Sequence, residues 1–164
     1  MKYGIIISCL FLTVFIALGI FYFSRTKPIT NYPSKGTDII AFGDSLVEGV
    51  GSTQSNDFVS LLSGKIGQPI VNLGHAGDTT ADGIARINEL DNHNPKVVIL
   101  LFGGNDHLRK IPISETFKNL TVLIQNIHAR GAIVLLLGVR GGLFNDRFDS
   151  EFEDLRDTYY TAFV

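Results

Sequence analysis

Four short apolar runs, separated by longer amphipathic segments, constrain the fold of this chain more than any other feature. The runs cover residues 39–42, 70–73, 97–102 and 133–137, and the last two are apolar almost throughout. Strands of this kind are typical of parallel sheets that are covered by helices on both faces. The pattern therefore predicts an α/β fold, a three-layer α/β/α sandwich with a parallel, flavodoxin-like sheet and right-handed crossovers.

The segments between and after these runs have the spacing of amphipathic helices. Apolar residues recur at helical intervals within 58–66, 84–90, 117–127 and 148–159. We expect Thr79 or Thr80 to cap the second helix, Ser114 to cap the third, and Gly131 to end the third.

A turn rich in glycine and polar residues follows each of the first three expected strands. The turns read Gly-Asp-Ser-Leu at 43–46, Gly-His-Ala-Gly-Asp-Thr at 74–79 and Gly-Gly-Asn-Asp at 103–106. Open α/β sheets bind ligands at the carboxyl ends of their strands. Ser45, Gly77 and Asn105 would bring a hydroxyl nucleophile and two N–H donors to that edge, which are the groups needed to attack a carbonyl and bind the resulting oxyanion.

Each turn also has a purely structural interpretation. Ser45 suits the start of a helix, Gly77 a tight turn, and Asn105 a turn stabilised by local backbone bonds. The α/β-hydrolase family is disfavoured, because residues 43–47 lack its Gly-x-Ser-x-Gly nucleophile elbow. The sequence also has neither a complete dinucleotide fingerprint nor a Gly-Lys-Ser/Thr phosphate loop.

An uncharged stretch, Tyr3 to Phe23, lies near the amino terminus and is flanked by basic residues. About 20 such residues span the roughly 30 Å hydrocarbon layer of a bilayer, so we expect a transmembrane anchor at 1–24. A cleaved signal peptide is the alternative. Residues 25–37 contain two prolines and are expected to form a linker, and residues 38–164 the globular domain.

Composition excludes several classes of function. The net charge of −2 over 164 residues gives no electrostatic basis for binding nucleic acid. Cys9 is the only cysteine, so the chain has no internal disulfide and no cysteine-rich metal site.

The three turns, in this order and each after an expected strand, resemble the motifs of the SGNH hydrolases, also called the GDSL esterase/lipase family. The matching segments are Gly-Asp-Ser-Leu at 43–46, Asn-x-Gly-x-x-Gly-Asp-Thr at 72–79 and Gly-Gly-Asn-Asp at 103–106. The chain is most similar to the branch of lysophospholipases, thioesterases and arylesterases. The resemblance covers roughly residues 38–140.

This resemblance implies a role for each motif. Ser45 would be the nucleophile, and the N–H groups of Ser45 and Gly77 and the side chain of Asn105 would bind the oxyanion. It implies no metal and no organic cofactor. The residues beside these groups are expected to line the substrate site: Asp44, His75, Asp106 and His107. Asp44 would also shape its turn.

The fourth motif of the family, an Asp-x-x-His whose histidine deprotonates the serine, has no match in this sequence. The segment at 157–160 has the aspartate without the histidine, and the four histidines at 75, 93, 107 and 128 are poor substitutes. We therefore expect a chain that is truncated before its last motif, with little or no esterase activity.

The leading interpretation is a serine hydrolase that cleaves carboxylic esters or thioesters through an acyl-enzyme on Ser45. Acyl lipids such as lysophospholipids, and sugar esters, are compatible substrates. The alternative is a membrane-tethered module that binds an acyl or glycan ligand without turnover, because the general base is missing. We expect a single-pass membrane protein whose domain lies outside the cytoplasm, with its small ester substrate and the membrane as its partners.

Overall fold

The computed structural model describes residue 15, residues 28–138 and residues 147–164. The expected membrane anchor at 1–24 lies outside the described residues except for Phe15. Among the described residues, no helix is both long enough and apolar enough to span a bilayer. The elements in chain order are β1 (Asp38–Gly43), α2 (Ser45–Glu48), α3 (Phe58–Ile66), β2 (Ile70–Gly74), α4 (Thr80–Ala85), η1 (Ile87–Asn92), β3 (Pro95–Leu101), α5 (Gly104–Leu108), α6 (Ile113–Ala129), β4 (Ile133–Leu136), α7 (Arg147–Tyr159) and β5 (Ala162–Phe163).

The strands form one parallel sheet in the order β2-β1-β3-β4-β5. This is the flavodoxin-like order that the sequence predicts, and its switch point lies where β1 is flanked by β2 and β3. The four expected strands are confirmed with shifts of one or two residues at their ends. The two-residue strand β5, which pairs with Leu135 and Leu136, was not expected.

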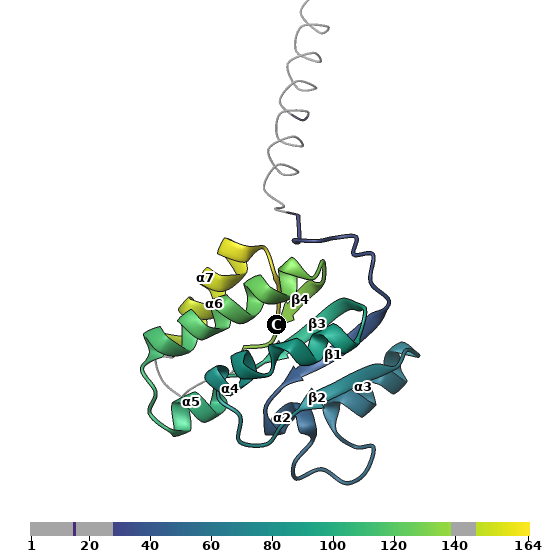
Figure 1. The fold of residues 1–164 in the computed structure, drawn as a ribbon, viewed down its shortest axis with the longest axis horizontal. Helices are drawn as coiled ribbons and strands as arrows, with labels where there is room; N and C mark the ends of the chain where they lie inside the picture. The colour runs from purple at the N-terminus through teal and green to yellow at the C-terminus, as the bar shows by residue number, and fades with distance from the viewer. Residues whose placement is uncertain (1–14, 16–27, 139–146) are drawn as a thin grey trace, which may run out of the picture.

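Helices cover both faces of the sheet (Figure 1). Side chains from alternate strand positions fill two apolar layers, one on each face. Ile40 and Phe42 of β1 belong to the larger layer, beneath α4, η1, α6 and α7. Ala41 belongs to the smaller layer with Val47 of α2 and Val59 of α3. Burial on both faces explains why the strands are continuously apolar.

Two helix predictions need correction. The helical spacing in 84–90 corresponds to two elements, α4 and the 3₁₀ helix η1, which meet at Arg86. Ser114 does not cap α6, because the helix begins at Ile113 after Pro112 and has no side-chain cap. Thr79 caps α4 as expected, and its hydroxyl accepts from the N–H of Asp82 in a capping box.

The described part of the expected linker is bound to the domain. Thr30 donates through its N–H and its hydroxyl to the carbonyls of Tyr160 and Tyr159. The Asn31 amide donates to the carbonyls of His128 and Ala132, both at 2.9 Å. These bonds hold residues 30–34 against the ends of α6 and α7, so this stretch is not a free tether.

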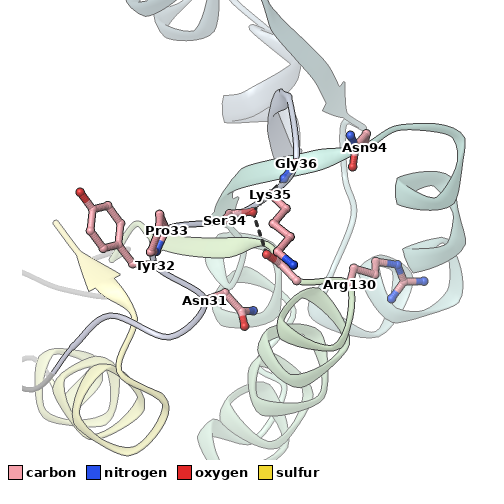
Figure 2. Close-up of a pocket in the computed structure, with 9 residues that line it drawn as sticks. Asn31, Tyr32, Pro33, Ser34, Lys35, Gly36, Asn94 and Arg130 are labelled. Atoms are coloured by element: carbon pink, nitrogen blue, oxygen red, sulfur yellow. Dashed lines mark hydrogen bonds between the residues drawn. The ribbon is translucent and has the colours of Figure 1, made fainter.

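A hollow of about 450 Å³ lies beside this segment, and Figure 2 shows the residues that line it. Its wall includes Gly36, Asn94 and Gly131, which precede β1, β3 and β4 respectively. The Ser34 hydroxyl closes one side by donating to the Gly131 carbonyl at 2.8 Å. The hollow is therefore at the amino edge of the sheet, opposite the three motif turns.

Candidate active site

The sheet brings the starting points of the three motif turns together. Gly43 at the end of β1 is paired with Gly74 of β2 on one side and with Leu101 of β3 on the other. Beyond these pairs, the N–H of His75 donates to the Gly43 carbonyl at 3.0 Å. The turns after β1, β2 and β3 therefore begin side by side at the carboxyl edge, near the labels α2, α4 and α5 in Figure 1.

Ser45 is the first residue of the short helix α2 and is half-buried. Asp44 precedes it as the N-cap, and its carboxylate accepts from the N–H of Leu46 at 3.0 Å. Because the first N–H groups of a helix have no intrahelical acceptor, the N–H of Ser45 is available as a donor. In the described part of the chain, the Ser45 hydroxyl has no hydrogen-bond partner.

Gly74 allows α2 to lie close to the end of β2. A Cβ at Gly74 would overlap the backbone of Glu48, so no other residue fits without displacing the helix. Asn72 stabilises this contact between α2 and β2, because its amide donates to the Val47 carbonyl at 2.7 Å.

The second turn presents Gly77 in the left-handed region, with φ at 87°. The N–H of Asp78 donates to the His75 carbonyl at 3.3 Å, and a positive φ at the third position of such a turn favours glycine. The guanidinium of Arg109 donates to the Gly77 carbonyl at 2.7 Å. No acceptor for the Gly77 N–H lies among the described residues, so this group is available to a ligand.

The third turn positions Asn105 in the first turn of α5, behind Gly103 with φ at 114°. The Asn105 amide nitrogen donates to the main-chain carbonyl of Asp78 at 2.9 Å. An amide nitrogen carries two hydrogens, so one donor remains after this bond. A hydrogen bond thus links the second and third motifs directly.

Asp44 is buried, with 2% of its surface exposed, and burial raises the pKa of its carboxyl. The nearby carboxylates of Asp78 and Asp106 raise this pKa further. One aspartate from each motif therefore contributes to a shared electrostatic environment, as the side-by-side position of the three turns leads one to expect.

The expected substrate-lining residues divide into two groups. Asp44 and Asp106 are buried and bind backbone groups of the turns, and their contact with substrate stays a prediction. Asp106 accepts from the N–H of Thr80 at 2.9 Å and from its hydroxyl at 2.5 Å, and so anchors the start of α4. His75 and His107 are exposed beside the second and third turns, and remain candidates for substrate contact.

None of the four histidines is hydrogen-bonded to Ser45 in the described residues. The His107 ring instead lies edge-on to the ring of Phe148, with centroids 5.6 Å apart. His93 ends η1 and His128 lies in the last turn of α6. Both are near the amino edge of the sheet, as their sequence positions predict.

Arg86 and Arg109 are parts of the site that the sequence did not single out. Arg86 donates to groups of the first and second turns, and Arg109 donates to Gly77. No local sequence pattern distinguishes either arginine, and only its long-range hydrogen bonds identify it as part of the site.

The family model described as "GDSL-like Lipase/Acylhydrolase family" matches residues 41–163. The esterase TesA of Pseudomonas aeruginosa is 34% identical over 108 residues, which are 62% of this chain and 54% of that protein. The arylesterase of Vibrio mimicus is 33% identical over 121 residues, 67% of this chain and 60% of that protein. This chain thus spans little more than half the length of these relatives.

The solved structure of AlinE4, described as an esterase of the SGNH-hydrolase family, superposes with a TM-score of 0.73. It is 32% identical in sequence, and the match covers 79% of this chain and 76% of that chain.

Proposed function

We propose that this chain, which belongs to the GDSL-like lipase/acylhydrolase family, is an ester hydrolase with Ser45 as its nucleophile. The observation that carries the proposal is the meeting of the three motif turns at one sheet edge, where Gly43 pairs with both Gly74 and Leu101. The names of its relatives, an esterase and an arylesterase, support carboxylic esters as the substrate class. Thioesters are a second class, supported by the similarity to thioesterase 1/protease 1/lysophospholipase L1 of Escherichia coli, which is 31% identical over 125 residues.

The reaction would proceed through an acyl-enzyme. The Ser45 oxygen bonds to the carbonyl carbon of the ester while its proton passes to a base, which no described residue supplies at Ser45 and which added imidazole can replace. The oxyanion that forms is bound by the N–H groups of Ser45 and Gly77 and by the free amide hydrogen of Asn105. The bond to the leaving group then breaks, the leaving group takes up a proton, and water releases the acid from Ser45.

The Ser45 hydroxyl has no hydrogen-bond partner among the described residues, and this favours a second candidate function. Without a base beside the serine, the same edge of the domain binds an acyl or glycan ester without cleaving it. The two functions differ in whether Ser45 becomes acylated.

Turnover of p-nitrophenyl esters by the full chain, with and without added imidazole, tests the proposed function. Imidazole can accept the Ser45 proton, so it should raise the rate of the wild-type chain above that of Ser45→Ala. Ser63→Ala is the matched control, because the Ser63 hydroxyl bonds to the Gln68 carbonyl at the end of α3, away from the site. Identical rates for the wild-type chain and Ser45→Ala at every imidazole concentration would favour the binding module.

A membrane anchor at residues 1–24 is part of the same proposal, with the domain outside the cytoplasm. It is supported by the uncharged run from Tyr3 to Phe23. Carbonate extraction of cell membranes should leave the full chain in the pellet and release a variant that lacks residues 1–24. Release of both would contradict the anchor, and protection of the domain from external protease in spheroplasts would contradict the orientation.

A further inference from the structure

Arg86 lies between α4 and η1, and its side chain is only 12% exposed. Its guanidinium is bound by four acceptors from three parts of the chain. The bonds run to the Gly43 carbonyl at 2.8 Å, the Leu73 carbonyl at 3.0 Å, the Asp78 carboxylate at 2.6 Å and the Glu89 carboxylate at 3.0 Å.

Two of these acceptors belong to the motif turns themselves. Gly43 is the residue before the Asp44–Ser45 turn, and Asp78 directly follows Gly77. The planar guanidinium presents its donors in a fixed fork, so it sets the separation and the angle between the groups that it binds. Its position is fixed in turn by the Phe42 ring, whose centroid is 4.4 Å from the guanidinium carbon.

The third motif is linked to the same arrangement through Asp78. The Asp78 carboxylate accepts from Arg86, and its main-chain carbonyl accepts from the Asn105 amide. A displacement of Asp78 would therefore move the Gly77 N–H and the Asn105 amide together.

We propose that Arg86 is a positioning residue that holds the Ser45 and Gly77 turns, and through Asp78 also Asn105, in the geometry that binds an oxyanion. The expected effect of Arg86 on kcat rests on the proposed function. Its effect on the positions of the turns does not require the chain to hydrolyse esters. Removing the guanidinium takes a donor from two carbonyls and two carboxylates in a largely buried place, and only the Gly43 carbonyl keeps another donor described above, the N–H of His75.

Arg86→Met and Arg86→Lys test this proposal, with Arg130→Met as the matched control. Arg130 is similarly enclosed at 19% exposure, and it bonds to Asp91 at 2.7 Å and to the Asn126 carbonyl at 2.9 Å near the opposite edge. Since a displacement of about 1 Å at a reacting centre can cost 10²-fold, Arg86→Met should lower the Ser45-dependent kcat, measured with added imidazole, about 10- to 100-fold. KM should change by less than about twofold, because binding of the ground state is not affected.

Arg86→Lys keeps the charge and restores part of the bonding, so its kcat should lie between those of the wild type and Arg86→Met. Arg130→Met should leave both constants unchanged. A general loss of folding would instead lower the active fraction of both methionine variants, and thermal unfolding of each variant measures that loss.

The backbone amide signals of Ser45 and Gly77 in ¹H–¹⁵N NMR spectra of the full chain in mild detergent provide a readout without turnover. Arg86→Met should shift or broaden both signals, whereas Arg130→Met should leave them in place. If the signals move but no variant, including the wild type, hydrolyses esters, the positioning role holds and the proposed function fails. If the signals stay in place in Arg86→Met, or if both methionine variants lower kcat equally, the positioning role is wrong.

Discussion

The side-chain amide of Asn105 donates a hydrogen bond of 2.9 Å to the main-chain carbonyl of Asp78. This bond joins the turn after β3 to the turn after β2, and it fixes the orientation of an amide whose second hydrogen has no acceptor among the described residues. Because a preorganised donor needs no reorientation when charge develops on a carbonyl oxygen, it stabilises the transition state more than the substrate.

Asn105→Ala should therefore lower the Ser45-dependent rate of ester hydrolysis by about 10²- to 10³-fold, with little change in KM. Asn126→Ala is the control, because the Asn126 amide donates within α6 to the Val122 carbonyl at 2.8 Å. Steady-state kinetics of both variants check this expectation. A rise in KM with an unchanged kcat would assign Asn105 to substrate binding instead.

Comparison of Gly77→Ala with Gly131→Ala should distinguish the cost of backbone strain from the loss of an oxyanion donor. Gly77 and Gly131 have φ angles of 87° and 77°, so an alanine at either position should cost about 1–2 kcal/mol of unfolding free energy. At Gly77 the nearest atom to the new Cβ is the Arg109 guanidinium at 3.8 Å, and at Gly131 nothing lies within 4 Å, so neither change crowds its surroundings.

Only Gly77→Ala should also reduce the Ser45-dependent rate, by about 10-fold or more, because the strained turn displaces an oxyanion donor. Urea unfolding and ester turnover of the two variants provide the comparison. Equal activities at equal losses of stability would remove Gly77 from the oxyanion site.

His128 should make the domain less stable in mild acid. Burial lowers the pKa of its imidazole, and its Nε2 atom is buried without a partner among the described residues. The unfolded chain therefore binds a proton at a higher pH than the folded chain does, so stability falls as the pH drops below about 6.5 and stops falling on this account below the folded pKa. Urea unfolding across this window should show a shallower pH dependence for His128→Phe than for the wild type, and an equal slope would contradict the assignment.

The local pattern of the sequence predicts the central sheet and the edge at which the three motif turns meet. Continuous apolar runs mark strands covered on both faces, and in a parallel sheet all the turns that follow such strands share one edge. Ser45, Gly77 and Asn105 were placed on neighbouring turns for this reason.

Elements that depend on long-range bonds were not predictable in this way. The apolar spacing of 84–90 continues through Arg86, but the bonds of Arg86 to Gly43, Leu73 and Asp78 lie where the helix changes to a 3₁₀ helix. The strand β5 has two residues, too few to produce a periodic signal.

The contacts of the segment expected as a linker were not predictable for a related reason. Its prolines and polar residues indicate a lack of regular structure, but they do not indicate whether the segment binds to the domain. Asn31 bonds to carbonyls about 100 positions away, at His128 and Ala132, and nothing in the local composition reveals these acceptors.

The most direct test of the account is the site at which a fluorophosphonate probe attaches to the full chain in the presence of imidazole, read by peptide mass spectrometry. Such a probe bonds covalently to a serine whose attack is assisted by an oxyanion site. Ser45 should be modified in the wild type and in Ser63→Ala, and no modification should occur in Ser45→Ala. Modification of another residue, or equal labelling of Ser45→Ala, would contradict the account.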